Sequence, residues 1–273
     1  MFKSKFEDIF KLAMESINVN GDLFEYSVAN TIDSYFKERN LDFVAVKTSK
    51  NTTYSDIEIS DLNGKTVCFV EAKFDHKANL YSKRLNVVNG IFVPFKSDNE
   101  IGKEICDLMN ENPMSQKFLD DLALYLHINK DEVNLYSSVI TPEEHNGLKI
   151  ISRDDLQKFF NKRKEQGLNK YIFIKDDFDV TNTLIRHYTK GKAFPASYLQ
   201  VDDDFYKLED NDVIKFNDVP MLSECGGSGY LKIRIGIRSE GYEIIPELKY
   251  KTAPNPSDYS FKEGSSKPQP EMK

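Results

Sequence analysis

Three residues combine the types and the spacing that chemistry at phosphorus needs: Asp56, Glu71 and Lys73, in the pattern D-x14-E-x-K. Two carboxylates, together with the backbone carbonyl of Ala72, supply hard oxygen ligands of the kind that Mg²⁺ prefers. A bound divalent cation polarises a phosphoryl oxygen and lowers the pKa of a coordinated water molecule. The Lys73 ammonium can orient or help to deprotonate that water, or stabilise negative charge that develops at phosphorus. The set therefore predicts a metal-dependent site with Mg²⁺ as its cofactor.

A β-hairpin is expected to hold these residues. Residues 54–60 alternate in polarity, an Asn-Gly pair marks a tight turn, and residues 66–74 form a nearly continuous apolar strand. Side chains alternate along a strand, so Glu71 and Lys73 share one face. Charged groups at the end of an apolar strand are costly unless they find partners or a metal, and this cost is a functional signal.

A helix is expected over residues 23–38, with Asp22 as its N-cap. This helix carries a third acid, Glu25, that is a candidate for the site. Apolar residues follow Glu25 at helical spacing, which places it on the apolar face or at its edge: Val28, Ala29, Ile32 and Phe36. Two interpretations stay open. Glu25 is either an active-site acid or a first-turn acid that interacts with the helix dipole and reaches water.

The arrangement resembles the PD-(D/E)xK nuclease superfamily, as found in type II restriction endonucleases. Ser55 stands where the proline of the motif often stands. The likeness extends over residues 22–160, because such enzymes often place an acid on the upstream helix, and because a later strand-then-helix segment, residues 133–160, would complete the core.

The resemblance implies an Mg²⁺-dependent endonuclease that hydrolyses DNA phosphodiester bonds, most closely a type II restriction enzyme that cuts a short specific sequence. It assigns Asp56, Glu71, Lys73 and Glu25 to catalysis, and Asp56, Glu71 and the Ala72 carbonyl to the metal. One active site cuts one strand, so cleavage of both strands of double-stranded DNA at a palindrome implies a homodimer. A cognate methyltransferase in the host is a further implied partner.

Basic residues outside the motif are candidates for DNA contacts, because Lys and Arg on loops and β-ribbons bind phosphates and read guanine edges. The candidates are Lys77, Lys83, Arg84, Arg186, Lys190, Lys192, Lys232, Arg234 and Arg238. A solvated protein surface with ordinary charges explains the same residues, and this alternative stays open.

Other functions remain possible at this stage. A repair, resolvase or mobile-element nuclease with the same core is one alternative, and a non-catalytic DNA-binding module is another. Glu58 is either a further acid of the site or an exposed strand residue, and Asp75 and His76 fit an ordinary polar loop better than a site. The four histidines and three cysteines lack zinc-site spacing, and a P-loop motif is absent from the sequence.

Composition is consistent with a globular protein that lies outside the membrane. The chain has 273 residues, 40% hydrophobic and 30% charged, and a formal net charge of -7, which disfavours indiscriminate coating of nucleic acid. No apolar run reaches the length of a membrane span. Three widely spaced cysteines, Cys68, Cys106 and Cys225, favour reduced structural thiols in a cytoplasmic protein.

Helices and strands are expected to alternate, which predicts an α/β class with a mixed central sheet flanked by helices and a C-terminal region rich in β-hairpins. Three parts are expected: a nuclease core over 1–165, DNA-recognition elements integrated with it over 166–252, and a disordered tail over 253–273. The element expectations are helices over 1–17, 100–110, 116–126, 154–164 and 181–187, and strands over 41–46, 133–140, 148–151, 171–174, 213–216, 230–237 and 242–245.

Overall fold

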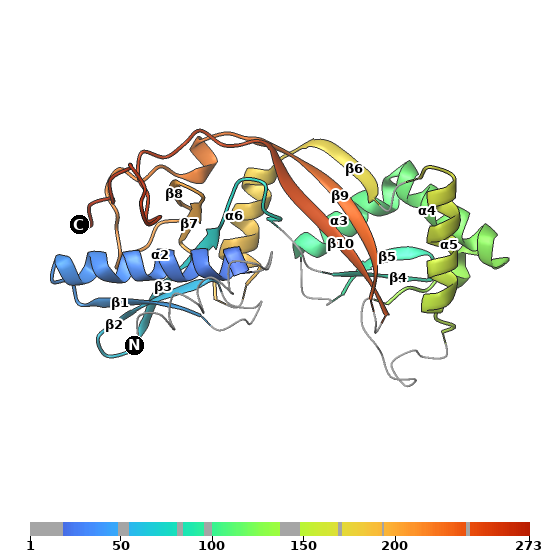
Figure 1. The fold of residues 1–273 in the computed structure, drawn as a ribbon, viewed down its shortest axis with the longest axis horizontal. Helices are drawn as coiled ribbons and strands as arrows, with labels where there is room; N and C mark the ends of the chain where they lie inside the picture. Colours follow the sequence, from blue (N-terminus) through green and yellow to red (C-terminus); the bar gives the residue numbers. More distant parts are fainter. Residues whose placement is uncertain are drawn as a thin grey trace, which may run out of the picture. The chain divides into compact units, whose positions relative to one another are not determined.

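The chain folds into a mixed α/β structure, which confirms the predicted class, with two five-stranded sheets in place of one central sheet (Figure 1). It divides into two compact units, each built from segments that are distant in the sequence. The computed structural model describes residues 19–48, 55–80, 84–95, 100–136, 148–168, 171–192, 194–238 and 241–273.

Unit 1 contains the motif. It consists of Met1–Ala78, Thr181–Gly227 and Thr252–Lys273. Its sheet has the order β1-β2-β3-β7-β8, in which β3 and β7 run parallel and the other neighbours run antiparallel. The elements are α2 (Val19–Glu38), β1 (Phe43–Lys47), β2 (Ile57–Asp61), β3 (Thr66–Lys73), α6 (Val180–Lys190), β7 (Tyr198–Val201), β8 (Asp204–Lys207) and the 3-10 helix η2 (Leu222–Glu224).

The predicted hairpin is present as β2 and β3. Its turn is closed by the Asp61 side chain, whose Oδ1 accepts hydrogen bonds of 2.9 Å from the backbone N–H groups of Asn63 and Lys65. Gly64 has a φ of 78°, a left-handed conformation that glycine adopts at little cost. The local sequence thus determines the turn, and the turn sets which residues face each other across the two strands.

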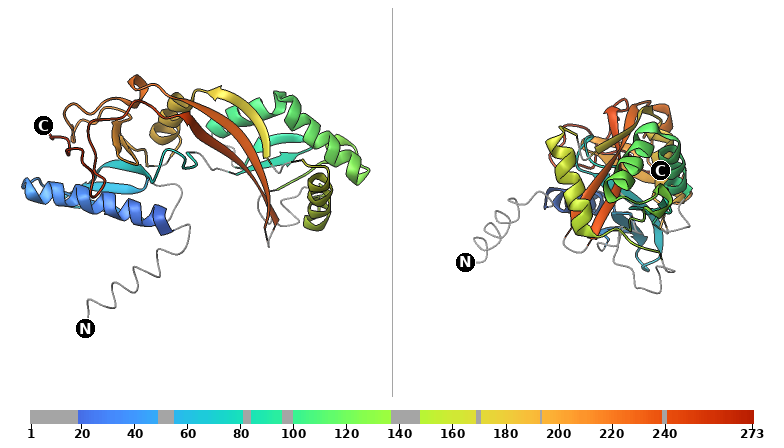
Figure 2. Two further views of the ribbon diagram at one scale, coloured as in Figure 1. Left: turned by 45° about the horizontal axis from the view of Figure 1, so that its top comes forward. Right: turned by 90° about the vertical axis from the view of Figure 1, so that its right-hand side faces the viewer.

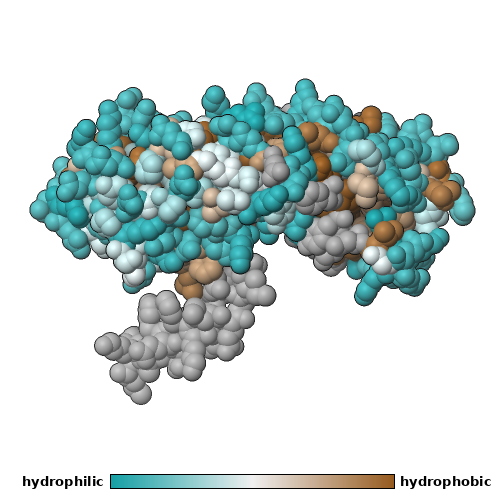
Figure 3. Space-filling view, turned by 90° about the horizontal axis from the view of Figure 1, so that it is seen from above, coloured by the Kyte–Doolittle hydropathy of each residue, from teal (hydrophilic) through white to brown (hydrophobic). Residues whose placement is uncertain are grey.

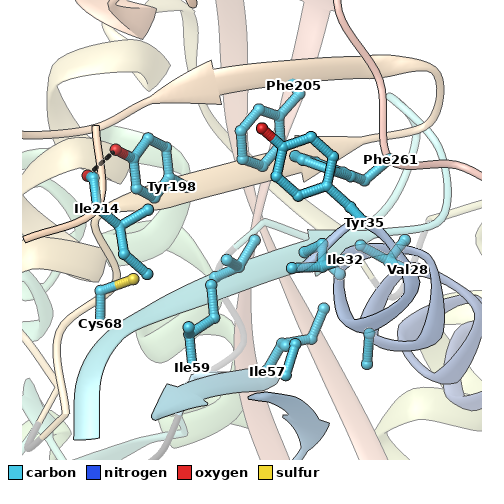
Figure 4. Packing of buried hydrophobic residues seen from close by; sticks show 14 of the residues in the cluster. Val28, Ile32, Tyr35, Ile57, Ile59, Cys68, Tyr198, Phe205, Ile214 and Phe261 are labelled. Atoms are coloured by element: carbon cyan, nitrogen blue, oxygen red, sulfur yellow. Dashed lines mark hydrogen bonds between the residues drawn. The ribbon is translucent and has the colours of Figure 1, made fainter. Parts of the chain in front are cut away.

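The core of unit 1 lies between α2 and one face of the sheet. Figure 4 shows Val28, Ile32 and Tyr35 of α2 beside Ile57 and Ile59 of β2, and all five are fully buried. Burial of each aliphatic side chain contributes about 1.5–3 kcal/mol relative to exposure to water. This packing fixes the strands of the hairpin by one face, so their other face is available for polar side chains.

Residues 253–273 pack onto unit 1, which corrects the prediction of a disordered tail. Phe261 is fully buried, with its ring centroid 5.5 Å from that of Tyr35 and 4.9 Å from that of Phe205. The Met272 N–H donates to the Tyr35 hydroxyl at 2.8 Å. The segment lies beside unit 1 in Figures 1 and 2. Its polar, proline-rich composition predicts disorder, but the buried Phe261 ring acts together with backbone hydrogen bonds to unit 1 and with the ion pairs Lys262–Asp202 and Lys267–Asp204 to hold the segment in place.

Unit 2 consists of Asn79–Val180 and Ser228–Lys251. Its sheet has the order β5-β4-β10-β9-β6, and helices α3, α4 and α5 contact β5, β6 and β9, respectively. The elements are β4 (Leu85–Val88), β5 (Ile91–Pro94), α3 (Glu100–Glu111), α4 (Pro113–Leu126), the 3-10 helix η1 (Lys130–Glu132), α5 (Arg153–Glu165), β6 (Tyr171–Phe178), β9 (Ser228–Arg238) and β10 (Gly241–Thr252).

Side chains cap two helices of unit 2. The Asn112 side chain caps α4, and the Ser152 hydroxyl caps α5 by accepting from the Asp155 N–H at 3.1 Å. Asp22 lies inside the first turn of α2 and is not its N-cap, since the helix includes Val19. The helix predicted over residues 1–17 lies outside the described residues.

The domain boundary predicted at residue 165 does not coincide with any boundary between the two units. The strand-then-helix segment 133–160 belongs to unit 2, so it does not complete the sheet of the motif. Residues 148–151 form no strand, and Leu135 makes only an isolated bridge with Val87. Instead, α6 and β7 complete that sheet, because β7 pairs with β3. Long-range pairing of this kind leaves no local signal in the sequence.

The surface, the helices and the cysteines can each be compared with what the composition predicts. The face shown in Figure 3 is mostly hydrophilic, with apolar side chains in small groups. None of the described helices has the length and apolar character that crossing a bilayer requires. All three cysteines are free and buried, which agrees with the predicted structural thiols.

Candidate active site

The two predicted carboxylates meet at one lysine. The hairpin register pairs Ile57 with Val70 and therefore places Asp56 beside Glu71 at the end of the ladder. Lys73 Nζ lies 3.3 Å from Asp56 Oδ2 and 2.5 Å from Glu71 Oε1. The Glu71 side chain is only 3% exposed, so the structure satisfies a deeply buried charge with a neighbouring ammonium.

The backbone of Ala72 holds Asp56 in place. Its N–H donates to Asp56 Oδ2 at 2.9 Å. Because β2 begins at Ile57, one residue after Asp56, the backbone pairing of β2 with β3 does not extend to this N–H, and the Asp56 side chain accepts from it instead. The N–H and C=O of one strand residue point to the same side, so the Ala72 carbonyl lies on the strand edge that Asp56 occupies. The three predicted oxygen donors therefore belong to one small region.

A second lysine, Lys192, also binds Glu71. Its ammonium contacts Glu71 Oε2, while Lys73 takes Oε1, and the Lys192 side chain is only 7% exposed. The buried ring of Tyr188 in α6 faces both cations, with its centroid 5.0 Å from Lys192 Nζ and 5.8 Å from Lys73 Nζ. These distances are within the range of cation–π attraction.

The charges of this cluster hold one another ionised. Burial by itself would raise the pKa of Glu71, but the Lys73 and Lys192 ammonium groups outweigh it and leave that pKa below its ordinary value. Burial would likewise lower the pKa of Lys73, yet the Asp56 and Glu71 carboxylates raise it well above its usual range. The two carboxylates therefore favour the protonated form of Lys73 in this arrangement.

Asp56 behaves differently from its partner. Burial and then the negative charge of Glu71 raise the pKa of Asp56, and these effects exceed the opposing effects of Lys73 and Lys192. Like charges held close together disfavour ionisation of one of them. A divalent cation at this point would relieve that repulsion, because it attracts both carboxylates at once.

Glu25 lies near the same cluster and has its own lysine. Its carboxylate contacts Lys47 of β1, which also lies 3.2 Å from Asp22 Oδ1 and is 6% exposed. Burial, followed by the charge of Asp56, raises the pKa of Glu25. Glu25 therefore interacts electrostatically with the motif, while the described structure directs its carboxylate to Lys47.

The donor set fits Mg²⁺, although it is not a complete cage. Within the described residues, no three His, Cys, Asp or Glu side chains gather as a metal site. Mg²⁺ needs fewer protein ligands, because it usually keeps several waters and binds through one or two carboxylates and substrate phosphates. Asp56 and Glu71, both within reach of the Lys73 ammonium, together with the Ala72 carbonyl, meet that requirement.

The predicted DNA-contacting cations fall into separate groups. Four of them bind carboxylates: Lys192 binds Glu71, Arg84 lies 3.5 Å from Glu243, and Lys232 and Arg234 lie 3.2 Å and 3.0 Å from Glu247. In the described structure, each of these four cations thus has a carboxylate partner in its own unit. The sequence alone cannot show such pairings, since each carboxylate lies on another element.

Three other candidates are exposed in unit 1. Lys77 lies just after β3, and Arg186 and Lys190 lie one helical turn apart on α6. Lys83 lies outside the described residues, as does the side chain of Arg238, whose backbone belongs to β9. Of the nine predicted cations, these three are exposed among the described residues of the unit that carries the motif.

Glu58, Asp75 and His76 each have a partner close by in the structure. Glu58 accepts a hydrogen bond from Thr66 across the hairpin. Asp75 accepts from the Lys77 N–H at 2.7 Å, which closes a turn, and His76 Nε2 lies 3.0 Å from Asp204 Oδ2. These contacts favour the structural interpretation of all three.

The sequence does not predict the roles of two lysines in this region. The motif gives no reason to select Lys47, and the sequence makes Lys192 a candidate for DNA contact instead of a partner of Glu71. The only sequence signal for Lys47 is its place at the end of an apolar strand, where a charge needs a partner. For Lys192 the basic character of its segment pointed to the surface, whereas the fold turns the side chain inward.

Comparisons with protein-family models, with curated proteins and with solved structures find no match to this chain. The geometry of the cluster and the resemblance of its motif are therefore the features that indicate a function for the chain.

Proposed function

We propose that the chain is an Mg²⁺-dependent endonuclease that hydrolyses DNA phosphodiester bonds. The observation that carries this proposal is the convergence of Asp56 and Glu71, from adjacent strands, on the single ammonium of Lys73. The three groups supply two carboxylates and one ammonium, and they lie where β2 begins and β3 ends.

Each residue has a distinct task in the proposed reaction. Asp56 and Glu71 would hold the metal with the Ala72 carbonyl, and the bound ion would supply Lewis-acid activation of the phosphate and of a water molecule. Lys73, which its neighbours keep protonated, would stabilise the negative charge that builds up on the phosphoryl oxygens during in-line attack. The cationic role is therefore favoured over a role for Lys73 as general base.

The architecture around the motif supports the proposal. Helix α2 packs on the core face of the mixed sheet, α6 and β7 follow, and β7 runs parallel to β3. This order is compatible with the restriction-endonuclease-like core that the motif implies, although the completing helix and strand come from residues 180–201. In the chain, unit 2 is inserted as two segments: Asn79–Val180 comes between β3 and α6, and Ser228–Lys251 comes between η2 and the C-terminal segment.

The finer assignment is a type II restriction enzyme that acts as a homodimer on a short sequence of double-stranded DNA, with a methyltransferase that protects the host. The exposed cations Lys77, Arg186 and Lys190 are the candidates for phosphate contacts in unit 1. Discrete fragments from a plasmid would support this assignment, and smeared products would favour a nonspecific or structure-specific nuclease instead.

The test is incubation of the purified protein with plasmid and phage DNA, unmodified and methylated, in millimolar Mg²⁺ or in EDTA. We expect cleavage with Mg²⁺ alone, and a loss of about 10²–10³-fold in rate in Lys73→Met, because one charge stabiliser of the transition state is removed. The matched control is Lys65→Met, which removes an exposed lysine at the turn of the same hairpin.

Circular dichroism and urea unfolding show whether Lys73→Met remains folded. Equal cleavage by Lys73→Met and the wild type would overturn the assignment of the site. No metal-dependent cleavage of any double-stranded, branched or single-stranded substrate by the folded wild type would overturn the enzymatic proposal itself.

A further inference from the structure

Lys192 has no part in the D-x14-E-x-K motif, yet it occupies one of the oxygens that the proposed metal site requires. Its ammonium binds Glu71 Oε2, and Lys73 binds Oε1 of the same carboxylate. Both oxygens of Glu71 are therefore held by ammonium groups. A cation that binds Glu71 together with Asp56 must displace at least one of the two lysines.

The two lysines differ in how firmly they are placed. Lys73 belongs to β3, where its carbonyl accepts from the Asp202 N–H at 2.8 Å, and its ammonium contacts both carboxylates. Its displacement would break both of those contacts. Lys192 lies outside the sheet, beyond the end of α6, and reaches Glu71 with a long side chain that has four rotatable bonds.

The backbone around Lys192 is well anchored, so its side chain is aimed at the cluster. At Gly191, a Cβ would lie 2.8 Å from the His187 carbonyl oxygen, a close approach that only glycine permits. Phe194 packs against Phe69, with ring centroids 5.6 Å apart, and its carbonyl accepts from the Ser55 hydroxyl at 3.1 Å. These contacts place Phe194, two residues after Lys192, beside Ser55 and Phe69.

The charges of the four groups balance. Asp56 and Glu71 are two acids, and Lys73 and Lys192 are two cations, so an added divalent cation meets a cluster with no net negative charge. We propose that Lys192 competes with the divalent cation for Glu71, and that on displacement its ammonium contacts the phosphate of the bound nucleic acid. This inference rests on the proposed nuclease function and adds a second cation to its site.

Tyr188 makes this exchange physically reasonable. Its buried ring lies within cation–π distance of Lys192 Nζ, at 5.0 Å from the centroid, so Glu71 is not the only group that attracts this ammonium. A phosphate oxygen that approaches the cluster supplies the negative charge that the ammonium then needs. Metal and substrate would therefore bind cooperatively. The metal frees the Lys192 ammonium for the phosphate, and the phosphate replaces the negative charge that the ammonium loses when it leaves Glu71.

The test uses the full chain with Lys192→Gln and Lys192→Met, and Lys65→Gln as the control for loss of an exposed lysine in unit 1. Titration calorimetry with Mg²⁺, without DNA, measures the affinity of the metal. We expect its Kd to fall by about three- to tenfold in both Lys192 variants, because a competing positive charge is removed. The Lys65→Gln protein should bind Mg²⁺ as the wild type does.

The second readout is the rate of DNA cleavage at saturating Mg²⁺, where weaker or tighter metal binding no longer matters. We expect a loss of at least about tenfold in the Lys192 variants, since one contact to the phosphate is absent, and partial recovery in Lys192→Arg. A lower Kd together with a lower rate supports the proposal, because a purely structural lysine would not tighten metal binding.

Two outcomes would overturn it. An unchanged or higher Kd for Mg²⁺ in the folded variants would exclude competition, and an unchanged rate at saturating metal would exclude the phosphate contact. Failure of the proposed function itself looks different, because then the wild type neither binds Mg²⁺ nor cleaves DNA. Urea unfolding identifies a variant that has lost its fold, and the other Lys192 variant then decides.

Discussion

Each of the two units buries carboxylates beside cations, and among the described residues of unit 1 two of these carboxylates meet at one lysine. In unit 1, Asp56 and Glu71 lie on neighbouring strands and share Lys73. In unit 2, Glu243 and Glu247 lie on the same strand, β10, and each has its own partners: Arg84 for Glu243, and Lys232 with Arg234 for Glu247.

Strand geometry explains why the two arrangements differ in what they can do. Four residues along a strand separate Glu243 from Glu247, which corresponds to about 13 Å at 3.3 Å per residue. One small cation cannot bridge that span. Opposite residues on paired strands lie about 5 Å apart, so Asp56 and Glu71 can share a ligand. Buried charge is therefore a weak sign of a site, and convergence of buried charges is the stronger one.

The largest expected contrast is in catalysis. Glu71→Gln keeps the shape of the side chain but removes a charge from the proposed metal site, and we expect DNA cleavage to fall by about 100-fold or more. Glu247→Gln makes the same chemical change in unit 2, and we expect a rate within about threefold of the wild type. Rates measured with Mg²⁺ on one plasmid check both, and equal losses in the two variants would remove the distinction between the units.

The next contrast is in stability. Glu247→Gln leaves Lys232 and Arg234 beside a neutral amide, and we expect the free energy of unfolding to fall by about 1–3 kcal/mol, with the lower part of the range favoured by the partial exposure of the two cations. Urea unfolding followed by circular dichroism measures the change. The control is Glu111→Gln, an exposed acid at the end of α3, and an effect no larger than that of the control would contradict the prediction.

The smallest expected effect is on the reactivity of one buried thiol in each unit. Burial raises the pKa of Cys68 in unit 1 and of Cys106 in unit 2 to about 12. An unperturbed thiol has a pKa of about 8.5, so at pH 8.5 the folded thiols hold about three orders of magnitude less of the reactive thiolate. We expect both to resist iodoacetamide at this pH until the surrounding unit opens.

Mass spectrometry of the labelled peptides compares the two thiols in one experiment. Glu247→Gln should speed labelling of Cys106 and leave Cys68 at the wild-type rate, because the lost ion pairs lie in unit 2. Protection should also decrease as the pH rises above about 8.5: a raised folded-state pKa means that the unfolded chain releases protons more readily there, which destabilises the fold. Rapid labelling of Cys68 in the native wild type would contradict the buried position of β3.

Short-range features of this protein follow from its sequence. The alternation of β2, the turn closed by Asp61 and the apolar run of β3 predict the hairpin, and the hairpin by itself brings Asp56, Glu71 and Lys73 together. The spacing of apolar residues in α2 predicts the face that packs on the sheet. Each of these patterns spans only a few turns or one tight loop, so local steric preferences and burial determine it.

The tertiary structure decided the remainder. Whether a lysine faces solvent or a carboxylate depends on the neighbours that folding supplies, and the Glu71 partner Lys192 lies 121 residues further along the chain. The pairing of β3 with β7, the assignment of β9 and β10 to unit 2, and the burial of Phe261 by the C-terminal segment are of the same kind. Such contacts form only when burial and pairing offset the entropy lost in closing the long intervening segment, and local composition does not contain that balance.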